Sequence, residues 1–171
     1  DIYVTGDLGD SFVGLKLLQK KISLNNVLLK YFKRKYYHPN LCISLTKKLL
    51  SFANTSIDIS DGLITDLEKL LSNQKLSFKL YFKDVPTSKN LNKLIDLNII
   101  KKASSISHGD DYQILFTASP SKSRIIFKTS KSLGIKISKI GKICNYSQKS
   151  QIIDEKNKKI TLKNKGYFHK F

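Results

Sequence analysis

Residues 56–63 are S-I-D-I-S-D-G-L, in which Asp58 lies within a predicted strand at 57–59 and Asp61 lies between that strand and a predicted helix at 62–72. Side chains alternate between the two faces of a strand, so Asp58 is expected on the face opposite its isoleucine neighbours. A carboxylate buried there without a cation or a hydrogen-bond donor would be costly. If Asp58 is buried, it therefore needs such a partner.

Two explanations fit these acids. In the first, Ser60 or Asp61 caps the helix at 62–72, and Gly62 relieves the backbone at the corner between strand and helix. Capping accounts for Asp61 but leaves Asp58 unexplained. In the second, Asp58 and Asp61 together form a cation site. The residues alone leave both explanations open.

Hydrophobic periodicity outside this stretch predicts the other elements. Apolar residues that recur at three and four positions predict helices at 9–20, 23–35, 41–53, 62–72, 89–96 and 121–133. Alternating or dense apolar runs predict strands at 57–59, 76–83, 112–118 and 135–143, and a hairpin across 151–153 and 159–163. The segment 97–110 is expected to be irregular. Strands and helices mix without strict βαβ alternation, which favours an α+β fold, a mixed β-sheet packed with helices, over a doubly wound sheet.

A second acidic segment, H-G-D-D-Y at 108–112, lies at the start of the strand predicted at 112–118. Adjacent Asp110 and Asp111 repel each other unless a positive group lies near them. A turn with two solvated acids is the alternative, and His108 is expected to be an incidental loop histidine. The aromatic chain end G-Y-F-H-K-F at 166–171 either docks on the core or supplies a ring that stacks on a flat ligand.

The net charge of +18 raises the question of nucleic-acid binding. The positive residues are nearly all Lys and are spread along the chain, and arginine occurs only at Arg34 and Arg124. Base-reading and bidentate phosphate contacts favour Arg, so solvated Lys faces are expected. A Lys-rich nucleic-acid-binding module remains a less favoured alternative. The chain contains neither GxxxxGK[ST] nor GxGxxG, which excludes those two phosphate-binding motifs.

Other sequence features concern the compartment and the completeness of the chain. Cys42 and Cys144 lie far apart without zinc-like spacing, which predicts reduced thiols in a cytosolic protein. No apolar run approaches the ~20 residues that span a bilayer. Methionine is absent and the sequence begins at Asp1, so we expect a processed chain or a piece of a longer protein.

Five motifs occur together in a recognisable order: T-G-D-L-G-D-S at 5–11, His-Pro at 38–39, S-I-D-I-S-D-G-L-I-T-D-L at 56–67, G-D-D-Y-Q-I-L-F at 109–116 and G-Y-F-H-K-F at 166–171. This set resembles the C-terminal half of bacterial thiamine-monophosphate kinases. They belong to a superfamily that includes aminoimidazole ribonucleotide synthetase and selenophosphate synthetase. The resemblance covers essentially the whole chain. It implies that 1–171 is a single C-terminal domain of the aminoimidazole ribonucleotide synthetase-like fold, from a larger two-domain enzyme whose N-terminal half is absent.

The resemblance also implies an activity and a set of site residues. The activity is ATP-dependent phosphorylation of thiamine monophosphate to thiamine diphosphate with Mg²⁺. Asp58 and Asp61 contribute to magnesium binding, and Ser60 contacts the nucleotide. Asp110 and Tyr167 lie at the thiamine substrate, where the family usually has Glu in place of Asp110. No catalytic base is expected, because the acceptor is already an anionic phosphate and the reaction needs charge neutralisation and positioning.

In the family, the N-terminal half carries much of the magnesium and nucleotide binding and most of the dimer interface. We therefore expect the chain to be inactive on its own, and the full-length protein to be a cytoplasmic homodimer without a nucleic-acid or membrane partner. The main alternative is another ATP-dependent enzyme of the same superfamily with a different acceptor. Asp110 and Tyr167 would decide between the two, because they lie where the acceptor binds.

Overall fold

The computed structural model describes residues 1–171 apart from 73, 148, 155, 163–165 and 167–171. The described strands form one seven-stranded sheet in the order β2-β4-β1-β5-β3-β6-β7. Their bounds are β1 (Ile2–Thr5), β2 (Ala53–Asp58), β3 (Leu76–Tyr81), β4 (Ile114–Ala118), β5 (Ile137–Asn145), β6 (Gln151–Ile153) and β7 (Lys159–Ile160). Neighbouring strands are antiparallel except β3 and β6, which are parallel. The sheet is therefore mixed, as the sequence predicted.

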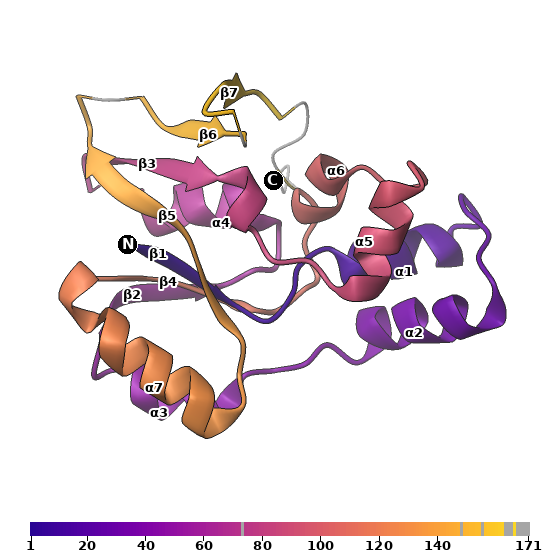
Figure 1. The fold of residues 1–171 in the computed structure, drawn as a ribbon, viewed down its shortest axis with the longest axis horizontal. Coiled ribbons are helices and arrows are strands. Elements are labelled where there is room, and N and C mark those ends of the chain that lie inside the picture. Colours follow the sequence, from indigo (N-terminus) through magenta and orange to yellow (C-terminus); the bar gives the residue numbers. More distant parts are fainter. Residues whose placement is uncertain (73, 148, 155, 163–165, 167–171) are drawn as a thin grey trace, which may run out of the picture.

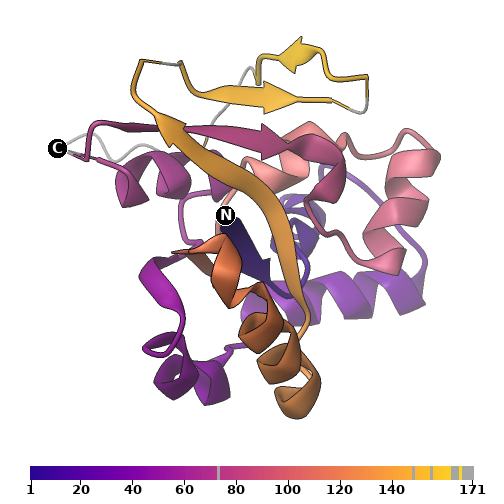
Figure 2. The ribbon, with the colours of Figure 1, turned by 60° about the vertical axis from the view of Figure 1, so that its left-hand side comes forward.

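The helices in the described part of the chain are α1 (Asp10–Leu18), α2 (Asn26–Tyr37), α3 (Ile43–Leu49), α4 (Leu63–Leu70), α5 (Lys89–Asp96), α6 (Lys102–Ile106) and α7 (Ser123–Leu133). Short 3-10 turns at Phe82–Asp84 and Pro120–Lys122 follow β3 and β4. Helix α4 covers one face of the sheet, and α3 and α7 lie together on the other (Figure 1). In Figure 2, where the ribbon is turned by 60°, the orange α7 still lies beside the purple α3. None of these helices is long and apolar enough to cross a membrane.

The alternation of side chains along the central strands builds two separate cores. On β1, Ile2 and Val4 pack into the cluster beneath α4, whereas Tyr3 packs into the cluster beneath α3 and α7. On β4, Leu115 and Phe116 divide between the same two clusters. Successive residues of a strand point to opposite faces, so strands that are apolar on both faces hold helices on both sides.

A third hydrophobic cluster lies beyond the end of the sheet, where α1, α2 and α5 pack together (Figure 1). Its fully buried members include Val13 on α1, Phe32 on α2 and Leu91 on α5. Gly14 lets α1 approach α2, because a Cβ at this position would lie 2.5 Å from the carbonyl oxygen of Phe32. The cluster thus packs α1 against α2 and α5.

Several element boundaries differ from those predicted. The helix predicted at 41–53 ends at Leu49, and its last predicted residue begins β2, which pairs with β4 along Ala53–Asp58. Strand β2 alternates between half-buried and exposed residues. Its polar side chains give no apolar pattern that predicts a strand, and its pairing with β4 stabilises it. Strand β1 was not predicted, and α6 forms within the segment expected to be irregular. The predicted hairpin is confirmed as β6 and β7.

Candidate functional site

The two acidic segments singled out in the sequence meet at one end of the β2–β4 pair, where Asp58 is in register with Ile114. Beyond this pair, the backbone N–H of Ile59 donates to the Gln113 carbonyl at 2.8 Å, and the N–H of Tyr112 donates to the Ile59 carbonyl at 2.9 Å. Sequence analysis predicted both segments but not their contact. The antiparallel register brings them together.

The contact is tightest at Gly109. A Cβ on this residue would lie 1.6 Å from the Ser60 carbonyl oxygen, so only glycine fits. The N–H of Asp110 then donates to the same Ser60 carbonyl at 3.0 Å. Asp110 and Tyr112 adopt φ values of 65° and 50°, a region that non-glycine residues rarely occupy. Backbone strain of this kind gathers at functional sites, where the surrounding structure holds it in place.

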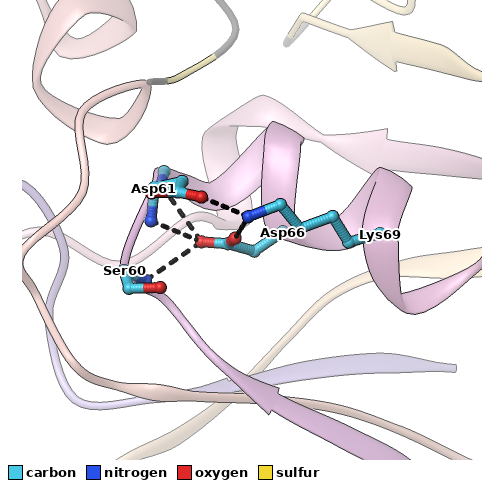
Figure 3. A network of polar contacts seen from close by, with 5 residues as sticks. Ser60, Asp61, Asp66 and Lys69 are labelled. Atoms are coloured by element: carbon cyan, nitrogen blue, oxygen red, sulfur yellow. Dashed lines mark hydrogen bonds and ion pairs between the residues drawn. The ribbon is translucent and has the colours of Figure 1, made fainter. Parts of the chain in front are cut away.

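The turn between β2 and α4 is organised by Asp66, a residue on the first turn of α4 (Figure 3). Its Oδ2 accepts hydrogen bonds from the backbone N–H groups of Ser60 (3.0 Å), Asp61 (2.9 Å) and Gly62 (3.1 Å). The Asp66 side chain is completely buried. Of the two explanations left open by the sequence, the one in which Ser60 or Asp61 caps this helix is wrong. Its N-cap is Gly62, which has no capping side chain, and Asp66 takes the N–H groups of the turn from inside the helix.

The carboxylate of Asp61 faces Lys69 (Figure 3). The Lys69 ammonium contacts Oδ2 of Asp61 and lies 3.2 Å from Oδ1 of Asp66. The Asp61 side chain is 13% exposed, and that of Lys69 is 47% exposed. The hydrogen bond to Asp61 is the main cause that raises the pKa of Lys69. Lys69 is thus a counter-cation at the edge of the turn.

Asp58 and Asp110 complete the acidic surroundings of this turn. Asp58 is exposed at the end of β2, next to the fully buried Ile59. Burial raises the pKa of the Asp110 carboxyl, the nearby Asp61 charge raises it further, and a hydrogen bond with the Tyr112 hydroxyl lowers it. Burial also raises the pKa of Tyr112, and the charges of Asp110 and Asp58 add to the effect. Asp110 is therefore within reach of the charge of Asp61, and Tyr112 is within reach of the charges of Asp58 and Asp110.

Asp111 joins two loops through hydrogen bonds, a role that the sequence had left undecided. Its Oδ2 accepts from the backbone N–H of Gly9 at 2.8 Å, and its Oδ1 accepts from the Ser11 hydroxyl at 2.7 Å. Burial raises the pKa of the Asp111 carboxyl to about 7 despite these hydrogen bonds. The carboxylate binds the loop before α1 to the segment before β4. The T-G-D-L-G-D-S motif contains both donors, but nothing in its pattern points to Asp111.

The remaining predicted residues lie at or beyond the edge of this arrangement. Ser60 is half-buried within the turn; its N–H donates to Asp66, and its carbonyl accepts from the Asp110 N–H and so joins the two segments. Tyr167 falls outside the described residues. Gly166 lies against the turn, since a Cβ on it would be 2.7 Å from the Asp61 carbonyl oxygen. The His108 ring packs on Phe12 with centroids 4.3 Å apart, and its Nδ1 lies 2.7 Å from the Ser104 carbonyl oxygen.

Comparison with known proteins relates the chain to kinases. The thiamine-monophosphate kinase of Buchnera aphidicola subsp. Schizaphis graminum (strain Sg) is 36% identical over 169 residues, which are 98% of this chain and 52% of that protein. That of Nitrosopumilus maritimus (strain SCM1) is 31% identical over 170 residues, with the same coverage. No family model matches the chain. The chain is homologous to about half of a thiamine-monophosphate kinase.

Solved structures confirm the fold. A thiamine-monophosphate kinase from Stenotrophomonas maltophilia K279a has a TM-score of 0.78 at 24% identity, over 91% of this chain and 49% of that one. AaThiL complexed with AMPPCP and TMP has a TM-score of 0.76 at 24% identity, over 98% of this chain and 50% of that one. Escherichia coli HypE has a TM-score of 0.69 at 14% identity, over 94% of this chain and 48% of that one. The α+β, aminoimidazole ribonucleotide synthetase-like fold that the resemblance implied is confirmed.

The donor set at the turn suits the magnesium expected for a thiamine-monophosphate kinase. Asp58 and Asp61 offer carboxylate oxygens, the hard donors that Mg²⁺ prefers, and Mg²⁺ is commonly held by one or two carboxylates plus substrate phosphates. Within the described residues, no group of three or more His, Cys, Asp or Glu side chains is placed to hold a metal ion. The chemistry of the two carboxylates suits a magnesium ion that also binds substrate phosphate.

Proposed function

We propose that this chain is part of a thiamine-monophosphate kinase, which transfers a phosphoryl group from ATP to thiamine monophosphate and forms thiamine diphosphate. The observation that carries the proposal is the meeting of the two acidic segments, in which the Asp110 N–H donates to the Ser60 carbonyl at 3.0 Å beside exposed Asp58. The named relatives support it, as does the solved complex of AaThiL with AMPPCP, an ATP analogue, and TMP.

In this proposal the acids of the β2–α4 turn face the phosphates. Asp58 and Asp61 would hold Mg²⁺, which when bound neutralises phosphate charge and aligns the reacting groups. Ser60 contacts the nucleotide from the same turn. Asp66 keeps the turn in shape through its hydrogen bonds to the backbone N–H groups. No residue is assigned as a general base, because the acceptor oxygen belongs to an anionic phosphate.

The acceptor would lie at the second acidic segment. The backbone N–H of Asp110 donates to the Ser60 carbonyl at 3.0 Å, which places this residue beside the turn, and its carboxyl would orient the thiamine substrate next to the transferred phosphoryl group. Tyr167 is proposed as the second substrate residue. Its stacking on the thiamine ring rests on the resemblance of the aromatic chain end.

The chain spans about half the length of the curated relatives it matches. We therefore propose that residues 1–171 form one C-terminal domain and that activity needs the other half of the kinase. The complete protein is proposed to be a cytoplasmic homodimer with ATP and thiamine monophosphate as its substrates. Neither nucleic acid nor a membrane is proposed as a partner.

The test is ATP-dependent conversion of thiamine monophosphate with Mg²⁺, comparing the chain alone with the chain joined to the missing half of a relative. We expect activity only in the joined protein. Asp58→Asn should lower kcat far more than the melting temperature, whereas Asp96→Asn, at an exposed position on α5, should leave both unchanged. A folded joined protein that is inactive on thiamine monophosphate but active on another phosphate acceptor would establish the sister-enzyme alternative.

A further inference from the structure

Lys69 reaches from the last turn of α4 back to the turn where α4 begins, and its ammonium lies between two carboxylates (Figure 3). It contacts Oδ2 of Asp61 and lies 3.2 Å from Oδ1 of Asp66. The first of these carboxylates belongs to the acid assigned to magnesium under the proposed function. One oxygen of Asp61 is therefore held by a cation of the chain itself.

We propose that Lys69 is a built-in competitor of the divalent cation at Asp61. The proposal rests on the assignment of Asp61 to the metal site. A divalent ion that approaches Asp61 meets the charge of Lys69, and it binds either by displacing the ammonium from Oδ2 or by remaining close to it. In both cases Lys69 weakens metal binding in the absence of nucleotide. When ATP is bound, its phosphates attract the ammonium as well as the divalent ion. The ammonium is then more easily displaced from Asp61, and the metal binds there more readily.

The surroundings of Lys69 suit a side chain that moves. The Asp66 carboxylate stays in place when Lys69 moves, because its Oδ2 accepts from the three N–H groups of the turn and its side chain is completely buried. Its Oδ1 remains available to the ammonium when Asp61 takes up the metal. The Lys69 side chain is 47% exposed and has a flexible stem, so its displacement toward Asp66 and solvent costs little. Lys69 thus has a second partner ready at its side.

The size of the effect follows from Coulomb's law. A divalent ion and an ammonium about 5 Å apart in a water-like dielectric repel each other enough to change an affinity by about tenfold. A charge on a distant helix is screened beyond about 10 Å at 0.1 M salt. Removing Lys69 should therefore act far more strongly than removing an unrelated surface lysine.

The experiment measures Mn²⁺ binding to the 171-residue chain without nucleotide, by calorimetry and by the electron paramagnetic resonance signal of free Mn²⁺. Lys69→Met should bind Mn²⁺ about tenfold more tightly than the unaltered chain, and Lys69→Arg should restore weak binding. Lys47→Met is the matched control, because Lys47 is exposed on α3, which packs on the opposite face of the sheet. It should change the affinity less than twofold. Adding Asp61→Asn to Lys69→Met should abolish the gain.

Each other outcome overturns the proposal. Equal or weaker binding by Lys69→Met would show that the lysine holds the site together instead of competing for it. An equal gain in Lys47→Met would reduce the effect to net charge, and absence of Mn²⁺ binding in all folded variants would remove the competition altogether. The failure of the proposed function is separate: a tenfold gain with no thiamine-monophosphate kinase activity in the joined protein would keep the competition and reject the reaction.

Discussion

Two buried aspartates, Asp66 and Asp111, have similar hydrogen-bonding roles but different charged neighbours. Each accepts backbone N–H hydrogen bonds from a loop and so fixes the course of the chain next to an acid, Asp61 in one case and Asp110 in the other. Asp66 also has a cation, because Lys69 lies 3.2 Å from it. Among the ion pairs of the described residues, none involves Asp111.

The two aspartates allow the effect of backbone hydrogen bonding on loop shape to be distinguished from the effect of charge compensation. Asp66 satisfies three backbone donors and belongs to an ion pair, so its carboxylate contributes both shape and charge compensation to the turn. Asp111 accepts from the Gly9 N–H and the Ser11 hydroxyl but forms no ion pair with a described residue, and burial raises its pKa to about 7. The two loops should therefore respond differently to substitution and to pH.

The largest expected effect comes from Gly109→Ala, which acts where the two segments touch. The new Cβ would lie 1.6 Å from the Ser60 carbonyl oxygen, and the backbone must separate to admit it. We expect unfolding to become easier by at least about 3 kcal/mol, at the upper end of overpacking effects. Urea unfolding measures the loss. A change below about 1 kcal/mol would mean that the two segments can separate at little cost in stability. The comparison of the two loops would then lose its basis, which is their contact.

The next effect is that of Asp66→Ala, which leaves the N–H groups of Ser60, Asp61 and Gly62 without their acceptor. Each buried donor that loses its partner costs about 1 kcal/mol or more, so we expect a loss of about 3 kcal/mol. Asp66→Asn keeps an oxygen acceptor for the turn and should recover most of it. Both are compared by thermal and urea denaturation. Equal losses in the two variants would assign the effect to the Lys69 ion pair rather than to the turn.

Asp111→Asn should change how stability depends on pH. A raised carboxyl pKa means that the folded protein holds a proton which the unfolded chain has lost, from the ordinary carboxyl range up to about pH 7. Stability due to this group is therefore greatest at acidic pH and falls as pH rises toward 7. Between pH 5 and 7 the fall should be about 2 kcal/mol.

The check is the unfolding free energy of both proteins at several pH values from 5 to 8, taken as a difference so that the histidines cancel. The Asn variant should lose the part of the slope that belongs to Asp111. Identical slopes in the two proteins would mean that Asp111 keeps its charge throughout this range.

The smallest expected effect on stability is that of Lys69→Met. Its ion pairs lie at a half-exposed side chain, and such pairs contribute about 0–1 kcal/mol. Its main consequence should appear in metal binding. A loss of about 3 kcal/mol by differential scanning calorimetry would show that Lys69 stabilises the turn as strongly as Asp66 does.

The parts that sequence analysis predicted and the parts it missed have physical reasons. The acids at Asp58, Asp61 and Asp110 were visible because charged residues stood next to apolar runs, and α5 and β6 were predicted with their bounds because their local patterns are clean. Strand β1 was missed because only four residues form it and its partners are distant. Helix α6 was missed because its five residues are too few for a periodic pattern.

The organisers of the site were the hardest residues to predict. Asp66 looked like an ordinary acid on a helix, yet it accepts from residues before the helix begins. Asp111 and Gly9 are separated by 102 residues, and local patterns carry no information on such a contact. The capping hypothesis failed for the same reason, since it assigned the turn to its nearest side chains.

The most direct test of the account is anomalous diffraction from crystals of the joined protein grown with Mn²⁺ and AMPPCP. The account predicts a Mn²⁺ peak bonded to the Asp61 carboxylate with phosphate oxygens completing its coordination, Asp58 nearby, and the Lys69 ammonium moved away from Oδ2 of Asp61. Mn²⁺ bound elsewhere, with Lys69 still paired to Asp61 beside the nucleotide, would contradict it.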